Sequence, residues 1–216
     1  MQAVSHSPLV RIAVFYDGNY FSKVSDYYKY QHERKKRINL YGLHSFIRKQ
    51  TAEKEKVDEK YCQIIEAHYF RGRFSAGAAK QAGKIESDRY FDDVLIGAGI
   101  IQHYYPLDET GSKPKERGID VWLSLEAYDL AIHKRFDILA LIACDGDYVP
   151  LVRKLNGIST RVMLLAWDFK YTWEGENYET RTSQSLIDES SYPIMMNQLI
   201  DSRDHKNDAV INSLFL

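Results

Sequence analysis

The stretch that decides the fold is FDILALIACDGD, residues 136–147. Its first part, FDILALIAC, is almost continuously apolar and shows no alternation of polar and apolar side chains. This pattern is typical of a strand that is buried on both faces of a sheet. Two acids, Asp145 and Asp147, follow the strand directly. Because ligands of open α/β sheets bind beyond the carboxyl ends of the strands, the same stretch also indicates where to look for a site.

Shorter apolar runs alternate with segments of helical length along the rest of the chain. Further strands are predicted at residues 11–16 (RIAVFY), 61–70, 100–105 and 160–167. Helices are predicted at residues 19–30, 40–50, 76–97, 119–134, 148–156 and 183–189. Loops are expected at residues 106–118 and 168–182, and a solvated turn or helix end at residues 51–60. Strands that alternate with helices predict an α/β fold whose mostly parallel sheet is covered on both faces.

The chain length and composition favour one globular domain. The 216 residues are 44% hydrophobic, which allows a core of respectable size. We expect a single domain over residues 1–216, with a core at about 11–190 and a C-terminal tail at about 191–216. The end of that tail, VINSLFL (residues 210–216), could pack on its own domain or on a partner, so a homodimer is possible.

Charge and cysteine content narrow the classes of partner and compartment. The net charge is −1, so any nucleic-acid contact must be a local patch and not a uniformly basic surface. The two cysteines match no zinc spacing and lie in apolar runs, which favours free thiols in a reducing compartment. The N-terminal residues do not resemble a signal peptide, and no apolar run approaches the roughly 20 residues of a membrane span. We therefore expect a cytoplasmic protein without a membrane segment.

Four acids occupy equivalent places in the predicted fold. Asp17 directly follows the first strand, Asp120 begins the helix before residues 136–144, and Asp145 and Asp147 come after that strand. If the first strand and residues 136–144 are neighbours where the strand order reverses, the four side chains converge on one crevice. Any one of these acids could equally be a turn former or a helix N-cap, so only the set of four indicates a site.

Carboxylates that converge in this way repel one another unless a cation neutralises them. Hard divalent cations take oxygen ligands from a few carboxylates and from substrate phosphate, and can activate water for attack at phosphorus. No cluster of His or Cys competes for a metal, which disfavours zinc. The acids therefore predict a Mg²⁺ or Mn²⁺ site for phosphodiester hydrolysis.

Three blocks of the sequence resemble, in chain order, the three motifs of NYN-domain proteins. They are FYDGNY (residues 15–20), ERGIDVWLSLEAYDLA (residues 116–131) and ACDGDYVPLV (residues 143–152). The NYN family belongs to the PIN-like nuclease superfamily and includes the LabA-like bacterial proteins. The resemblance runs from about residue 11 to residue 188. It implies a PIN-like three-layer α/β/α fold with strand order 3-2-1-4-5, and metal-dependent ribonuclease activity on RNA.

The resemblance also implies roles for single residues. Asp17, Asp120, Asp145 and Asp147 would be the metal ligands, and Asn19 would orient Asp17 or contact the substrate. Glu126 stands where many relatives have Asp and would be a further ligand. On a helix, however, Glu126 points about 120° away from Asp120.

Four positions differ from the usual motifs without removing a ligand. Ala143-Cys144 replaces the common Ser-Gly, and Tyr148 replaces the common Phe. Arg117 takes the place of the usual Lys before Gly-Ile-Asp. There it could grip a phosphate with two parallel hydrogen bonds, or simply lie solvated in its loop.

Basic and aromatic residues gather in two further segments. Arg71 and Arg73 follow the second predicted strand and would emerge at the same sheet edge as the acids. The run RKKR (residues 34–37) follows several tyrosines, which suits a platform for single-stranded nucleic acid but also an ordinary solvated face. The aromatic loop at residues 168–182 could be a flap over the substrate or a dimer contact.

Three functions remain open on the sequence. The first is a metal-dependent endoribonuclease in which carboxylates hold Mg²⁺ or Mn²⁺ and no protein nucleophile takes part. The second is a phosphatase of the haloacid-dehalogenase type with Asp17 as nucleophile, although Asn19 stands where that chemistry needs an acid. The third is an RNA-binding or regulatory module that keeps the fold but has no turnover.

Overall fold

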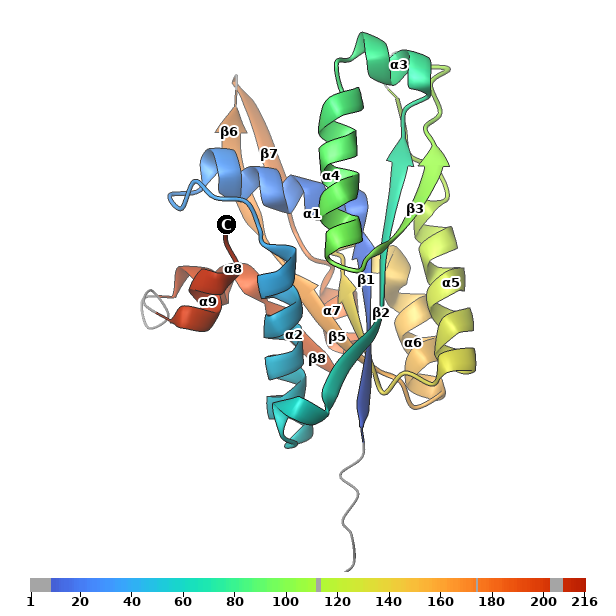
Figure 1. The fold of residues 1–216 in the computed structure, drawn as a ribbon, viewed down its shortest axis with the longest axis vertical. Helices are drawn as coiled ribbons and strands as arrows, with labels where there is room; N and C mark the ends of the chain where they lie inside the picture. The colour runs from blue at the N-terminus through green and yellow to red at the C-terminus, as the bar shows by residue number, and fades with distance from the viewer. Residues whose placement is uncertain (1–8, 112–113, 174, 203–207) are drawn as a thin grey trace, which may run out of the picture.

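A computed structural model describes residues 9–111, 114–173, 175–202 and 208–216. Its centre is a parallel six-stranded sheet in the order β3-β2-β1-β4-β5-β8 (Figure 1). The strands are β1 (Val10–Asp17), β2 (Cys62–Arg73), β3 (Ile101–Pro106), β4 (Ile138–Ile142), β5 (Arg161–Ala166) and β8 (Tyr192–Met195). The predicted α/β fold and the order 3-2-1-4-5 are confirmed, and β8 extends that order by one strand.

Helices cover both faces of the sheet and complete a three-layer α/β/α arrangement. One face carries α1 (Gly18–Asp26), α2 (Leu40–Glu55), α4 (Ile85–Gly97), α8 (Met196–Asp201) and α9 (Ala209–Ser213). The other face carries α5 (Ile119–Lys134), α6 (Val149–Gly157) and α7 (Gln184–Glu189). A short π-helical turn, Tyr27–Gln31, continues α1, and α3 (Ala76–Gln81) precedes α4. In the described part of the chain no helix is both long and apolar enough to span a bilayer.

The sheet divides the apolar core into two clusters. Along β4, Ile138, Ala140 and Ile142 pack under the α1–α2 layer, whereas Leu139 and Leu141 pack under α5 and α6. All five residues are fully buried. Both faces of β4 therefore need apolar side chains, which explains why its sequence shows no alternation.

Three expected elements are wrong in detail. The helix expected at residues 76–97 is two helices, because Gly83 between them adopts a positive φ of 63° that ends the first. Residues 51–55 continue α2 and are not a turn, since Thr51 is buried beneath it. Residues 168–182 are not a loop. They form an antiparallel hairpin of β6 (Phe169–Trp173) and β7 (Glu176–Thr180), in which the rings of Tyr171 and Tyr178 stack at 5.1 Å.

The C-terminal tail packs on its own domain. The side chains of Ile211, Leu214 and Phe215 are buried, and the Arg34 guanidinium lies 4.8 Å from the centre of the Phe215 ring. Arg34 also donates a hydrogen bond to Asn212. Arg34, the first residue of the basic run at residues 34–37, therefore binds the C-terminal tail of its own domain.

A partly buried histidine on α2, His44, makes the stability of the fold depend on pH. Burial lowers the pKa of His44 from 6.5 to about 4, and its Nε2 has no hydrogen-bond partner among the described residues. In the unfolded chain His44 is therefore protonated below about pH 6.5, whereas in the folded chain it is protonated only below about pH 4. We expect stability to be full above pH 6.5 and to fall toward pH 4, by up to about 3 kcal/mol from this group.

Denaturant unfolding of the wild type and His44→Leu across this pH range measures the effect. The variant should lose less stability on acidification, since it removes the group that must be protonated. Equal losses in both proteins would contradict the assignment to His44.

Candidate active site

The site lies where the strand order reverses. β1 pairs with β2 on one side and with β4 on the other, so its carboxyl end borders the crevice that parallel α/β sheets use for ligands. Asp17 is the last residue of β1, and Asp145 is the N-cap of the 3₁₀ turn Gly146–Tyr148 that follows β4. Two of the predicted acids thus stand at adjacent strand ends.

Asp17 is held in a fixed orientation at the start of α1. Its Oδ1 accepts a hydrogen bond from the Tyr20 N–H at 3.0 Å, and its Oδ2 accepts one from the Tyr148 hydroxyl at 3.2 Å. Burial raises the pKa of the Asp17 carboxyl, and the two hydrogen bonds and the Lys23 ammonium oppose that rise. The carboxylate is therefore held in one orientation, but these contacts offset only part of the cost of burying its charge.

The charges of three of the predicted acids act on the Tyr148 hydroxyl, which is hydrogen-bonded to Asp17. Its pKa is raised first by burial and then by the negative charges of Asp17, Asp120 and Asp145. Asp120 comes from the first turn of α5, so the three carboxylates that act on Tyr148 belong to three separate elements. Tyr148 itself was not among the predicted site residues, although it is the group that the three acids share.

Two other predicted ligands lie differently. Asp147 is exposed, as Asp145 is, and its N–H donates to Oδ1 of Asp145 at 3.0 Å. Glu126 lies beside His103 of β3, where its charge raises the pKa of a ring whose pKa burial lowers. Its place on α5 agrees with the rotation of about 120° away from Asp120 that helical geometry gives.

A carboxylate that the sequence reasoning missed borders Asp17 from the other side. Glu116 accepts a hydrogen bond from the Gly72 N–H at 2.7 Å. Burial raises its pKa, Asp17 raises it further, and Arg71 and Lys23 lower it. Glu116 opens the second NYN-like block, so its place in that motif was the available signal. Lys23, one turn after Asn19 on α1, had no such signal.

The donor set fits a hard divalent cation by its chemistry. Among the described residues, no three side chains of His, Cys, Asp or Glu gather closely enough to hold a metal by themselves. Mg²⁺, however, usually keeps several waters and binds through one or two carboxylates together with substrate phosphate. The oxygens of Asp17, Asp120 and Asp145 meet that requirement, and the buried charge of Asp17 gives a cation something to neutralise.

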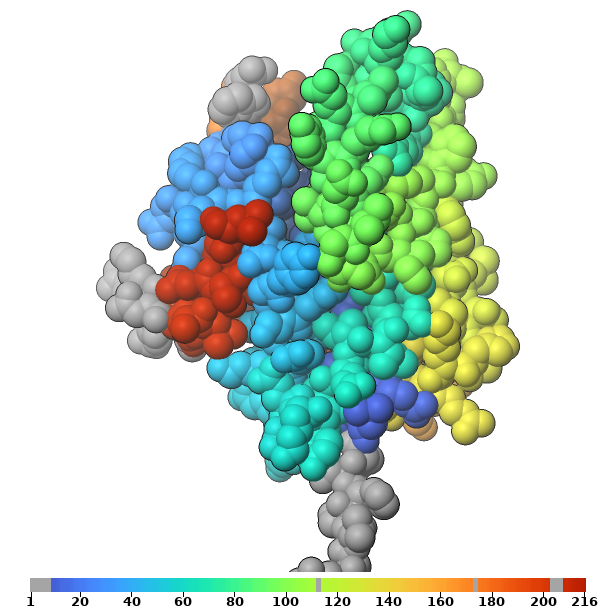
Figure 2. Space-filling model, viewed as in Figure 1, coloured from blue at the N-terminus to red at the C-terminus, as the bar shows by residue number. Residues whose placement is uncertain are grey.

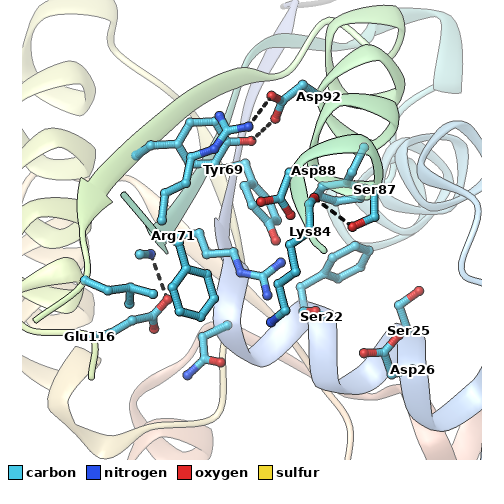
Figure 3. A pocket seen from close by; sticks show the side chains of 18 of the residues that line it. Ser22, Ser25, Asp26, Tyr69, Arg71, Lys84, Ser87, Asp88, Asp92 and Glu116 are labelled. Carbon is cyan, nitrogen blue, oxygen red and sulfur yellow. Dashed lines mark hydrogen bonds and ion pairs between the residues drawn. The ribbon is translucent and has the colours of Figure 1, made fainter. Parts of the chain in front are cut away.

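A cavity of about 440 Å³ lies beside Asn19 and Glu116, although Asp17, Asp120 and Asp145 are not among its described lining residues. It lies between α1, α4 and the carboxyl ends of β2 and β3, and Asn19, Arg71, Arg73 and Glu116 line it (Figure 3). From outside it is the furrow between the blue surface of the N-terminal helices and the green surface of α4 (Figure 2). Three of the four predicted substrate-binding residues thus share one cavity.

The predicted substrate-binding arginines differ in their partners. Arg73 forms an ion pair with Asp92 at 2.7 Å and covers the Tyr104 ring at 4.4 Å. Arg117 is 72% exposed and pairs with Asp108 at 2.9 Å in the loop before α5. It is absent from the described lining of the cavity.

Known proteins support the fold and the family. The structure resembles the crystal structure of VPA0982, a protein of unknown function from Vibrio parahaemolyticus, with a TM-score of 0.53 and 19% identity over 90% of this chain and 96% of that one. At that identity the likeness shows the fold alone. The uncharacterized protein MJ0482 of Methanocaldococcus jannaschii is 26% identical over 83 residues, which is 38% of this chain. The match covers 32% of that relative's length.

The family comparison covers most of the chain. The NYN domain family matches residues 11–197, a range that contains the ends of β1 and β4, the whole of α5 and the cavity. The acids at Tyr148 all fall within this range. The chain therefore belongs to the NYN domain family, a family of PIN-like nucleases.

Proposed function

We propose that this chain is a metal-dependent endoribonuclease that hydrolyses phosphodiester bonds of RNA. The observation that carries the proposal is that Tyr148, hydrogen-bonded to Asp17, also feels the charges of Asp120 and Asp145. These acids come from distant parts of the chain and meet at the carboxyl end of the sheet, where α/β folds bind ligands. Membership of a nuclease-like family supports a hydrolase.

In this proposal Asp17, Asp120 and Asp145 hold Mg²⁺ or Mn²⁺, and Asp147 and Glu126 are candidates for outer positions. The cation would supply an activated water and stabilise the negative charge that develops at phosphorus. Tyr148 orients Asp17 through the hydrogen bond to its Oδ2. Asn19, Arg71 and Arg73 would hold substrate phosphates in the cavity, and Arg117 would contact the strand outside it.

A second candidate is an RNA-binding module without turnover. It is favoured by one observation: the described acids do not form a ready-made metal site of three ligands. A haloacid-dehalogenase type of phosphatase has less support, because Asn19 still stands where its general acid would be. A homodimer also stays a prediction, which sedimentation of the purified protein would measure.

Cleavage of labelled RNA by the wild type and by Asp145→Asn separates these functions. We expect cleavage with Mg²⁺ or Mn²⁺, none with EDTA, and a loss of at least roughly 100-fold in the variant, because even outer partners of a metal site are typically worth 10- to 100-fold. Asn retains the N-cap hydrogen bond from Asp147, so the turn after β4 should survive.

Asp129→Asn is the matched control, since Asp129 is an acid of α5 that is 68% exposed and pairs with His133. It should cleave like the wild type. RNA binding without metal-dependent cleavage would support the non-catalytic module instead. Release of phosphate from small phosphate esters would support the phosphatase.

A further inference from the structure

Four cations line the cavity, and they fall into two kinds. Arg37 lies 4.0 Å from Asp26, and Arg73 lies 2.7 Å from Asp92, so each of these has a carboxylate partner. Arg71 and Lys84 also line the cavity, but neither has a carboxylate within ion-pair distance in the described part of the chain. Arg71 has a hydrogen bond with the Tyr69 side chain, which is neutral near pH 7. Among the described residues, the cavity therefore holds two cations without a carboxylate partner.

Arg71 and Lys84 reach the cavity from opposite walls. Arg71 belongs to β2, and Lys84 immediately precedes α4 with its ammonium 4.8 Å from the centre of the Phe74 ring. In Figure 3 the two charged ends come together in the middle of the cavity, near Ser22. Two like charges so placed repel each other, and an anion between them would remove that repulsion.

Acids near Arg71 do not replace such an anion. Burial lowers the pKa of Arg71, but Tyr69, through a hydrogen bond and its charge, and then Glu116 and Asp88 raise it above its ordinary value. Glu116 is engaged by the Gly72 N–H, and burial raises the pKa of its own carboxyl. These two acids thus influence Arg71 only through their charge, and neither is hydrogen-bonded to its guanidinium group.

We propose that this cavity binds the terminal phosphate monoester of an RNA strand, with Arg71 and Lys84 as its two cations. A monoester carries a charge of about −1.5 to −2 near pH 7, which matches two cations better than the single charge of an internal diester. Guanidinium and ammonium groups bind phosphate oxygens through charge-assisted hydrogen bonds. A volume of about 440 Å³ suits one nucleotide with its phosphate.

The position of the cavity gives the terminal phosphate a consequence for cleavage. Asn19 and Glu116 belong to its lining, and Glu116 is close enough to Asp17 for their charges to interact. A strand anchored by its end in the cavity would therefore pass the acids at a set distance. This part rests on the proposed ribonuclease, and it predicts cuts at a fixed distance from a phosphorylated end.

Binding measured in EDTA tests the cavity without depending on catalysis. Short single-stranded oligoribonucleotides of one sequence would carry a 5′ phosphate, a 3′ phosphate or hydroxyls at both ends, with a fluorophore at the end not being tested. Fluorescence anisotropy then compares their affinities for the wild type, Arg71→Met and Lys84→Met. The 5′ and 3′ forms identify which end of the strand the cavity takes.

We expect one phosphorylated form to bind the wild type about tenfold more tightly than the hydroxyl form, as two charge-assisted contacts would give. Lys84 is exposed, so Lys84→Met should fold normally and lose most of this preference. Arg89→Met is the matched control, because it removes one cation from the exposed face of α4 outside the cavity lining. It should keep the preference.

Equal affinity of the wild type for all three oligonucleotides would overturn the inference, and so would a preference that Lys84→Met retains. These results are separate from the proposed catalysis. A phosphate preference without metal-dependent cleavage would keep the cavity and remove the nuclease. Metal-dependent cleavage without a phosphate preference would support the nuclease and overturn the phosphate-binding cavity.

Discussion

Replacing Asp17 by Asn is expected to abolish RNA cleavage while leaving the fold intact and, without divalent metal, no less stable. The side chain keeps its size, and the Asn Oδ1 can still accept the hydrogen bond from the Tyr20 N–H that begins α1. What disappears is a carboxylate whose burial disfavours its charge. Burying that charge costs stability, and its expected role is to bind a cation. The variant should therefore lose activity without losing stability.

The expected loss of cleavage is at least roughly 100-fold, since the groups that merely orient metal ligands are commonly worth 10- to 100-fold. Thermal unfolding provides an independent measurement. Mg²⁺ or Mn²⁺ should raise the Tm of the wild type relative to EDTA, because a ligand that binds only the folded state stabilises it. The same ions should raise the Tm of Asp17→Asn much less.

Glu53→Gln is a suitable control, because Glu53 is an exposed acid on α2, on another part of the surface. It should behave as the wild type in both measurements. An Asp17→Asn protein that still cleaved RNA at the normal rate would remove Asp17 from the active site, whatever its stability.

Replacing Gly18 by Ala is expected to damage both the fold and the site. An added Cβ would lie 2.5 Å from the carbonyl oxygen of Phe70 and 2.6 Å from the Tyr69 ring. The Tyr69 hydroxyl also donates a hydrogen bond to the Gly18 carbonyl at 3.0 Å, so helix and strand are held together at this point. Neither neighbour can move easily. The Phe70 carbonyl belongs to the backbone of β2, where Phe70 pairs with Asp17, and the Tyr69 side chain is fully buried.

Overpacking of this kind typically costs about 1–3 kcal/mol. It should also push the start of α1 away from β2 and move Asp17, so cleavage should fall by more than the loss of folded protein explains. Denaturant unfolding gives the first quantity, and cleavage at a temperature where the variant is fully folded gives the second.

Gly77→Ala is the matched control, because an added Cβ at Gly77 in α3 meets nothing within 4 Å. Within a helix this change should be neutral or slightly stabilising. If Gly18→Ala were equally harmless, the tight contact between α1 and β2 would not be what places Asp17.

Much of the fold was predictable because it depends on local patterns. The unbroken apolar run of β4 reports burial on both faces, and the alternation of strands with helices reports a parallel sheet. Asp17 and Asp145 were also predictable, since a residue that follows a strand in the sequence follows it in space. The hairpin β6–β7 and strand β8 were missed, because short strands depend on the neighbours they pair with.

The sequence by itself therefore determined the acids at the two strand ends and the resemblance to the family, and that resemblance implied the order of the first five strands. Only the tertiary structure decided that the charges of Asp120, Asp17 and Asp145 all act on Tyr148. It likewise decided that Glu126 acts on His103 and that Asp17 acts on Glu116. The tertiary structure also decided which cations of the cavity have a carboxylate partner. The reason is geometric: side-chain direction depends on how each helix is rotated against the sheet, and that rotation is set by packing between segments that are distant in the chain.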